Sequence, residues 1–262
     1  MSEQGTLDAG PANGRLHDAT SGLAKMGAVV LFLARVLRHC APALAKPVDV
    51  LAQIYNAGAR SLVVVLCALF VGLVVGLQGY SLLQRFGSES ALGVAVALGL
   101  VSDLGPVMTA ILFAGRVGTS IASAIGLMGA TDQFAAMEMM AVDPVRLVIA
   151  PRFLGGLVAM PLLTAIFTCT GIFGGHLFGV TIMGIESGTY WSQMQSAVQL
   201  HDVTEGLLKS ALFGVTCSLI AVYEGFHAEP TAAGVALATT RTVVGSTVFT
   251  LILDYLLTAA FI

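Results

Sequence analysis

The sequence predicts an all-α membrane protein with five transmembrane helices, and three observations support that fold class. The 262-residue chain is 56% hydrophobic and has a mean hydropathy of +0.90. Only 10% of its residues are charged, whereas a soluble domain carries roughly a quarter. Long apolar stretches recur along the chain, and helices can cross a bilayer because they satisfy their own backbone hydrogen bonds.

The N-terminal region is expected to lie outside the hydrocarbon of the bilayer. Residues 1–24 are rich in Gly, Asp, Ser and Asn, which is typical of a disordered tail. The apolar run 26–34 is similar to a signal-peptide core, but Arg35 and Arg38 follow it before any small-residue cleavage site. We therefore expect an N-terminal interfacial helix anchored by basic residues, and a single membrane domain over residues 25–262.

Five stretches are the predicted transmembrane helices. They cover residues 61–84, 90–115, 153–180, 204–223 and 242–262. Asp103 interrupts the second stretch and Asp254 the fifth, while Lys209 lies near the end of the fourth. We expect Asp254 to pack against another span or to contact a second copy of the chain. An odd number of spans places the two termini on opposite sides of the membrane.

The distribution of basic residues predicts the orientation. If the N-terminus is cytoplasmic, ten Lys and Arg residues lie on the cytoplasmic side, and only Arg85 and Lys209 lie outside. This asymmetry is a strong positive-inside bias. We therefore expect a cytoplasmic N-terminus, a C-terminus on the opposite side, and a cytoplasmic segment between the second and third spans.

Glycines recur at every fourth residue in two of the spans. Gly72 and Gly76 follow this spacing in the first span, and Gly171, Gly175 and Gly179 follow it in the third. Small residues at such intervals let helix backbones approach closely. The pattern indicates either packing within the bundle or the seam of a homodimer, and the sequence leaves both open.

The segment between the second and third spans predicts a short helix over about 131–143. Phe134, Met137 and either Met140 or Ala141 recur at helical spacing, which places them on one face. Prolines at Asp143-Pro144 and Ala150-Pro151 predict a rigid corner at each site, because the residue before a proline avoids the helical region. The helix either packs beneath the bundle or couples the protein to a cytoplasmic motor subunit. Methionines are adaptable contacts, which favours the second function.

Four stretches of this sequence resemble the MlaE family, the permease subunits of phospholipid ABC transporters that work with MCE-domain proteins. The resemblance runs from about residue 40 to the C-terminus. Its motifs are GLVVGLQGY at 72–80, LGPVMTAILFAGRVGTSIASAIGLM at 104–128, EMMAVDPVRLVIAPR at 138–152 and ATTRTVV at 238–244. The block with Glu138, Asp143-Pro144 and Pro151-Arg152 is the most specific of them.

This resemblance implies an architecture and a role. Family permeases form a homodimer in the bacterial inner membrane, each subunit having an interfacial helix and five transmembrane helices. Two cytoplasmic ATPase subunits bind below, a hexameric MCE protein sits on the periplasmic side, and a STAS-domain subunit often accompanies the ATPase. The complex moves phospholipids between the inner membrane and periplasmic carriers, which maintains outer-membrane lipid asymmetry. The C-terminus of this chain would then be periplasmic.

The resemblance also implies that the segment between spans two and three is a coupling helix. The residues that would meet the ATPase are Phe134, Met137, Glu138, Met139, Met140, Asp143, Pro144 and Arg152. The chain contains no G-x-x-x-x-G-K-[ST] phosphate loop, so ATP and Mg²⁺ are expected on the partner ATPase rather than on this chain.

The end of the first span and the start of the second are the predicted walls of a lipid cavity. Apolar bulk is mixed there with a few polar groups, and family permeases place an outward-open lipid pocket in this region. The candidate residues are Gln78, Tyr80, Leu82, Leu83, Phe86, Asp103 and Leu104.

Asp103 is the candidate with two alternative roles. An acid within an apolar span is costly and usually faces the interior of the bundle. Family members have Arg-Glu-Leu-Gly-Pro here, whereas this chain has Ser102-Asp103-Leu104-Gly105-Pro106, so the acid is shorter and the arginine is missing. Asp103 is either paired within the bundle or part of the transport path.

Other functional classes are weaker or excluded. A net charge of −3 does not suggest a nucleic-acid partner, and four cysteines without ligand-like spacing do not suggest a metal site. The sequence has no nucleophile–base pair within or beside the spans that would indicate an enzyme. The remaining alternative is a membrane scaffold that holds MCE and cytoplasmic partners together without transporting lipid.

Overall fold

The computed structural model describes residues 62–261, together with positions 32, 36, 38, 51 and 53–55. The predicted disordered tail 1–24 and most of the predicted interfacial helix lie outside the described residues. Every regular element in the described part of the chain is helical, which agrees with the predicted all-α class. Five of these helices are long and apolar enough to cross a membrane, as predicted.

The first two spans are joined by a short 3₁₀ turn, η1 (Glu89–Ala91). The first span is α3 (Leu62–Arg85), which agrees with the predicted limits to within a residue. The second span is one continuous helix in which two π-helical segments interrupt the α-helix. Its parts are α4 (Leu92–Leu98), η2 (Gly99–Leu104), α5 (Gly105–Phe113), η3 (Ala114–Gly118) and α6 (Thr119–Ala130).

The remaining elements complete the bundle. Helix α7 (Gln133–Met139) follows the second span. The third span comprises η4 (Val145–Ile149), α8 (Ala150–His176) and η5 (Leu177–Ile182). A short helix, α9 (Ser187–Ala197), leads to the fourth span, α10 (Leu200–Phe226), and the fifth span is α11 (Ala232–Phe261).

Four spans are longer than predicted. The fourth runs over Leu200–Phe226 rather than 204–223, and three others are extended further. The second runs over Leu92–Ala130 and the third over Val145–Ile182, and the fifth begins ten residues before position 242. The predicted ends fell at arginines, but a long basic side chain can extend along a helix toward water without ending it. The 39-residue second span is about 58 Å long, roughly twice the hydrocarbon thickness of a bilayer.

Only one of the two predicted proline corners is present. The Asp143 Oδ1 atom accepts a hydrogen bond of 2.9 Å from the Val145 backbone N–H, so Asp143 caps the new helix at Pro144. Pro151 instead lies inside a continuous helix, two residues after the end of the π-helical segment Val145–Ile149. The i→i+5 pairing of that segment relieves the clash that a proline ring makes in a regular α-helix.

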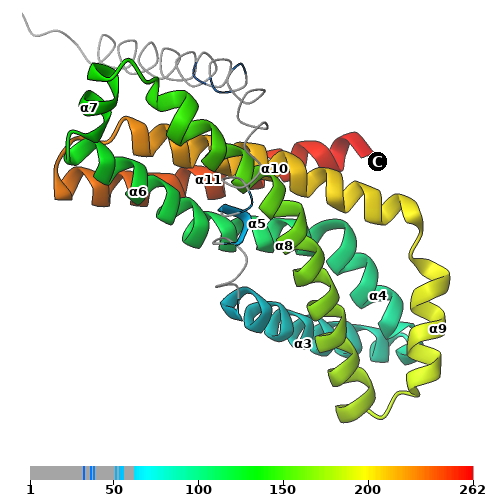
Figure 1. Cartoon of the computed structure of the whole chain (residues 1–262). Helices are drawn as coiled ribbons and strands as arrows, with labels where there is room; N and C mark the ends of the chain where they lie inside the picture. The colour runs from blue at the N-terminus through cyan, green and yellow to red at the C-terminus, as the bar shows by residue number, and fades with distance from the viewer. Residues whose placement is uncertain are drawn as a thin grey trace, which may run out of the picture.

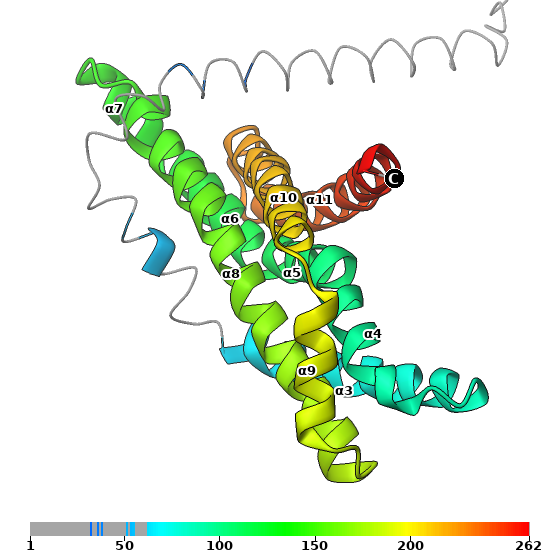
Figure 2. The same cartoon turned by 90° about the vertical axis from the view of Figure 1, so that its right-hand side faces the viewer.

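The spans pack on both sides of α8. Helix α3 lies along the second half of α8, α5 and α10 also pack against α8, and α6 and α11 pack against α10 (Figure 1). Figure 2 shows α9 connecting the end of the third span to α10, and α9 packs mainly against α4. The larger core cluster contains Phe113, Phe153, Phe167 and Phe213, and a smaller one contains Leu92, Val96, Leu100 and Tyr190.

The glycines of the first and third spans form a seam between α3 and α8, which we call the glycine seam (Gly72, Gly76, Gly171, Gly174 and Gly175). A Cβ atom on Gly72 would collide with the backbone carbonyl of Gly171, and one on Gly174 would lie 2.5 Å from the carbonyl oxygen of Leu69. The glycine pattern therefore serves close packing within the chain.

Candidate functional site

A cleft opens between the last turns of α3 and the second span. Its volume is about 510 Å³. The residues that line it are Val75, Gln78, Gly79, Ser81, Leu82, Arg85, Ala95 and Leu104. The Gln78 amide, the Ser81 hydroxyl and the Arg85 guanidinium add polar groups to a wall that is otherwise mostly aliphatic. Such a lining suits a ligand with a charged head and an apolar body.

The structure brings together three of the predicted cavity residues, Gln78, Leu82 and Leu104. The others lie elsewhere. Tyr80 donates a hydrogen bond of 3.3 Å to Glu89 Oε2, and Leu83 packs against the smaller core cluster.

Phe86 follows the end of α3 and is 77% exposed, so it lies outside the cleft lining. Helical periodicity explains this division, because residues 78 and 82 share a face of α3 that residues 80 and 83 do not. The same spacing extends the face to Arg85, which was not among the predicted cavity residues.

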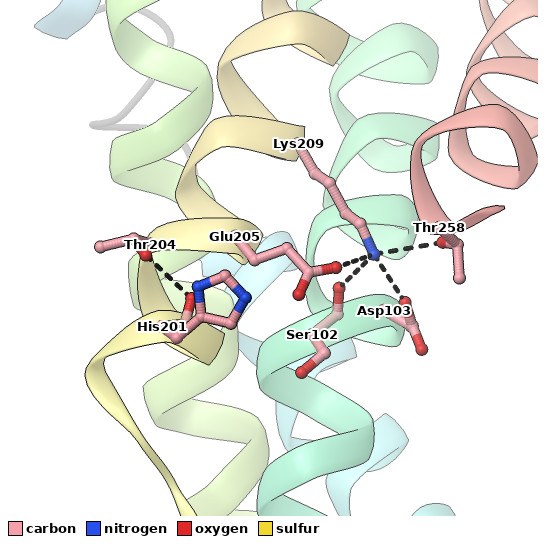
Figure 3. A network of polar contacts seen from close by, with 7 residues as sticks. All are labelled: Ser102, Asp103, His201, Thr204, Glu205, Lys209 and Thr258. Carbon is pink, nitrogen blue, oxygen red and sulfur yellow. Dashed lines mark hydrogen bonds and ion pairs between the residues drawn. The ribbon is translucent and has the colours of Figure 1, made fainter. Parts of the chain in front are cut away.

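A buried lysine lies at the centre of a polar network beside the cleft (Figure 3). Lys209 on α10 is fully buried, and its Nζ atom lies 2.9 Å from Asp103 Oδ1 and 2.9 Å from Glu205 Oε1. The ammonium also donates hydrogen bonds to the Ser102 carbonyl oxygen at 3.2 Å and to Thr258 Oγ1 at 3.1 Å. We call Lys209, Asp103, Glu205 and Thr258 the lysine cluster. It connects η2, α10 and α11.

The lysine cluster balances the cost of a buried charge. Removing an ammonium from water costs several kcal/mol, and paired carboxylates compensate that cost only when their geometry is good. Asp254 on α11 lies one turn before Thr258 and interacts electrostatically with Lys209. Its Oδ1 atom is buried and has no hydrogen-bond partner among the described residues. The expectation that Asp254 packs against another span agrees with this position.

The position of Lys209 differs from the sequence-based expectation. It was assigned to the outer side of the membrane, near the end of the fourth span. The structure places it nine residues into α10, about 14 Å from the start of that helix. Glu205, four residues earlier, and the acid in the second span were the available signals for this pairing.

Asp103 connects the lysine cluster with the cleft. Its carboxylate is paired within the bundle, which agrees with one of its two predicted roles, yet its side chain is 52% exposed. The next residue, Leu104, lines the cleft. Both residues belong to η2, and π-helical segments frequently occur at functional sites. A movement of η2 would therefore change the cleft and the lysine cluster together.

Helix α7 presents the other set of candidate residues. Phe134 and Met137 are half-buried on its inner face, and the Phe134 ring lies 5.5 Å from that of Phe226. Met139 is 85% exposed and Met140 is 67% exposed. Ala141 is exposed as well, so the prediction that Met140 or Ala141 shares the face of Phe134 and Met137 is wrong. The α-helix ends at Met139, and Ala141 adopts a φ of 57°, so the chain leaves the helical path there.

The remaining residues assigned to coupling are divided between surface and interior. Glu138 and Asp143 are exposed, and Pro144 is buried at the corner before η4. Arg152 instead lies on α8, where its guanidinium approaches Met128 Sδ at 3.8 Å. Arg152 thus contacts α6 rather than extending the surface formed by α7.

Comparison with known proteins places most of the chain in a single family. A family model described as Permease MlaE matches residues 50–260. The intermembrane phospholipid transport system permease protein MlaE of Haemophilus influenzae is 48% identical over 209 residues, which cover 79% of this chain and 80% of that protein. A probable ABC transporter permease protein of Rickettsia typhi is 36% identical over 210 residues, covering 80% of this chain and 81% of that protein.

A plant protein is also similar to this chain, at lower sequence identity. The chloroplastic protein TRIGALACTOSYLDIACYLGLYCEROL 1 of Arabidopsis thaliana is 30% identical over 214 residues, which cover 81% of this chain and 61% of that protein. The region matched by the family model contains the five spans, the cleft, the lysine cluster and α7.

Proposed function

Because the chain belongs to the MlaE permease family, we propose that it is the permease subunit of an ABC transporter that moves phospholipids between the inner membrane and periplasmic carriers. This activity would maintain the lipid asymmetry of the outer membrane. The observation that supports it most directly is the cleft at the end of α3. Leu82, Leu104 and Val75 offer aliphatic surface to acyl chains, and Arg85 offers a guanidinium to a phosphate group.

The proposed orientation places the N-terminus in the cytoplasm and the C-terminus in the periplasm. Arg85 then lies at the periplasmic end of α3, so the cleft is nearest the MCE carrier that would exchange lipid with it. Helix α7 faces the cytoplasm. A hexameric MCE protein and a STAS-domain subunit are further partners on the basis of family membership.

The proposed motor consists of two separate ATPase subunits that carry ATP and Mg²⁺. The exposed side chains of Met139 and Met140 form the docking surface, since flexible methionines are common on partner-binding surfaces. We expect Met139→Glu to weaken ATPase binding in a pull-down. Gln133→Glu is the control that should retain binding, because Gln133 is exposed on the same helix but lies about 120° around it from Met139.

The proposed homodimer is supported by the exposed apolar surfaces of α3 and α11. Only 22% of the most apolar stretch of α3 is buried within the chain, and only 11% of that of α11. A second copy of the chain covering part of these surfaces would place two clefts around a common path.

Phospholipid transfer in a reconstituted complex tests the proposed transport function. Leu82 lines the cleft and Leu77 does not, although both are exposed on α3, at 59% and 54%. We expect Leu82→Trp to fill the cleft and lower ATP-dependent transfer of a fluorescent phospholipid, with ATPase binding unchanged. Leu77→Trp should transfer lipid at close to the normal rate. Normal transfer by Leu82→Trp would contradict the cleft as the lipid site. No ATP-dependent transfer by the unmodified complex, together with no lipid co-purifying with it, would favour the scaffold alternative.

A further inference from the structure

A second pocket lies between α8, α9 and α10, and it shares no lining residue with the cleft. Its volume is about 440 Å³. Its lining includes Ala165 and Cys169 from α8, Met194 and Val198 from α9, and Val203 and Leu207 from α10. No residue that lines this pocket carries a formal charge.

The mouth of the pocket faces the surroundings of the bundle. Ala165, Cys169 and Leu207 are exposed, although each belongs to a helix that is long enough to cross a membrane. The floor is closed, because Gly206 packs so tightly against the Val101 carbonyl that a Cβ atom there would collide with it. In a membrane the medium at this mouth is lipid, so the pocket opens to the hydrocarbon and not to water.

A polar helix covers one end of the pocket. Helix α9 connects the end of the third span at Ile182 to the start of the fourth at Leu200, which places it at the boundary of the bilayer. Its Met194 and Val198 line the pocket, while Gln195 lines the rim and is exposed. The order of an apolar pocket and then a polar helix matches the order of acyl chain and headgroup in a phospholipid.

We propose that this pocket binds one acyl chain of a bilayer phospholipid, whose headgroup lies against α9. The site goes beyond the proposed function, because it requires only that the protein lies in a membrane and not that it transports lipid. A volume of about 440 Å³ lies within the usual range of ligand sites, about 300–1,000 Å³.

The dimensions favour a lipid chain over a transmembrane helix of a partner. A helix with its side chains is about 10–12 Å wide, so this volume would hold only about one turn of it. An extended acyl chain is thin and flexible enough to enter a narrow opening between three helices. It would also supply the dispersion contacts that the pocket walls lose when the pocket is empty.

Photo-crosslinking tests the acyl-chain site. The full chain, with the subunits that co-purify with it, is reconstituted without ATP into phosphatidylethanolamine and phosphatidylglycerol vesicles. These vesicles contain a phosphatidylcholine that carries a diazirine in its acyl chain. We expect several-fold more crosslinks at Cys169 and Leu207 than at Leu162 and Ile166, which are exposed on α8 outside the pocket. Equal labelling of all four positions would overturn the proposal.

Matched variants separate the pocket from the general lipid surface. Ala165→Phe should fill the pocket and lower crosslinking at Leu207 and Met194 several-fold, whereas Ile166→Phe should leave it unchanged. Cys169→Phe serves the same purpose if Ala165→Phe does not fold. Crosslinks that persist in the filled variants, or a partner protein crosslinked in place of lipid, would contradict the site. Since no ATP is present, these outcomes do not depend on whether the complex transports lipid.

Discussion

The glycine seam and the lysine cluster join helices by opposite physical means. The seam brings two backbones together by removing side chains, so that Gly72 meets Gly171 without intervening atoms. The lysine cluster joins η2, α10 and α11 through a buried ammonium and its oxygen partners. The seam is therefore sensitive to added volume, and the cluster is sensitive to lost charge. Asp103 of the cluster adjoins Leu104 of the cleft, so the cluster and the cleft share the segment η2.

The largest expected effect is that of removing the charge at the centre of the lysine cluster. Lys209→Met leaves Glu205 and Asp254 without their cation, and loss of one partner of a buried pair costs about 3–5 kcal/mol. Denaturation in detergent should report this decrease in the free energy of unfolding. Adding Glu205→Gln to Lys209→Met should recover part of the loss. Unchanged stability of Lys209→Met would show that the cluster does not hold these helices together.

Added volume in the glycine seam should have the second-largest effect. In Gly72→Ala the new methyl group collides with the Gly171 carbonyl, and overpacking of this kind costs about 1–3 kcal/mol. Gly115→Ala is the matched control, because no atom lies within 4 Å of the added carbon. That control should gain up to about 1 kcal/mol, since alanine favours a helix more than glycine does. Equal stabilities of the two variants would contradict close packing at the seam.

Tyr190 lies at the edge of the glycine seam, next to Gly175. Its hydroxyl donates a hydrogen bond of 3.4 Å to the Ile172 carbonyl oxygen, so Tyr190→Phe should cost about 0.5–1.5 kcal/mol. Burial raises the pKa of Tyr190 from 10.0 to about 12. The unfolded chain therefore ionises first, and folded-state stability falls as the pH rises from 10 to 12. Phenolate absorbance of the wild type minus that of Tyr190→Phe should give this pKa, and a value near 10 would show that the ring is hydrated.

The smallest expected effect on stability comes from Asp103→Asn. The Asp103 side chain is half exposed, and exposed pairs contribute about 0–1 kcal/mol, so Lys209 should remain in place on Glu205. We expect phospholipid transfer to fall in this variant while subunit assembly remains intact. A variant that transfers lipid normally would leave Asp103 with a structural role alone.

Apolar patterning predicted the fold class and the number of spans because that signal is strong and local. It did not predict their lengths, since Arg116, Arg152 and Arg241 lie within helices rather than at their ends. The π-helical segments were also missed, because they reflect packing between spans. Helix α9 was missed as well, because its sequence is polar and its position depends on the helices that it covers.

The candidate site was predicted only in part, because some of its contacts join residues that are far apart in the sequence. Gln78, Leu82 and Leu104 line the cleft, and Asp103 was identified as an unusual acid in a span. Its partner Lys209 lies 106 residues away in the sequence, and only the folded bundle brings the two together. Arg85 was predicted to lie on the outer side but was not recognised as part of the cleft.

The π-helical segment η2 changes the direction in which the side chains that follow it in the second span point. A π-helical turn accommodates about one residue more than an α-helical turn, and each residue of an α-helix advances the side-chain direction by about 100°. Leu92 and Val96 meet Tyr190 before η2, and Asp103 meets Lys209 at its end. If the second span were an unbroken α-helix, the side chains of these two sets would point in different directions around the helix. Only one set could then face its partners. The irregular turn keeps both in phase along a single helix.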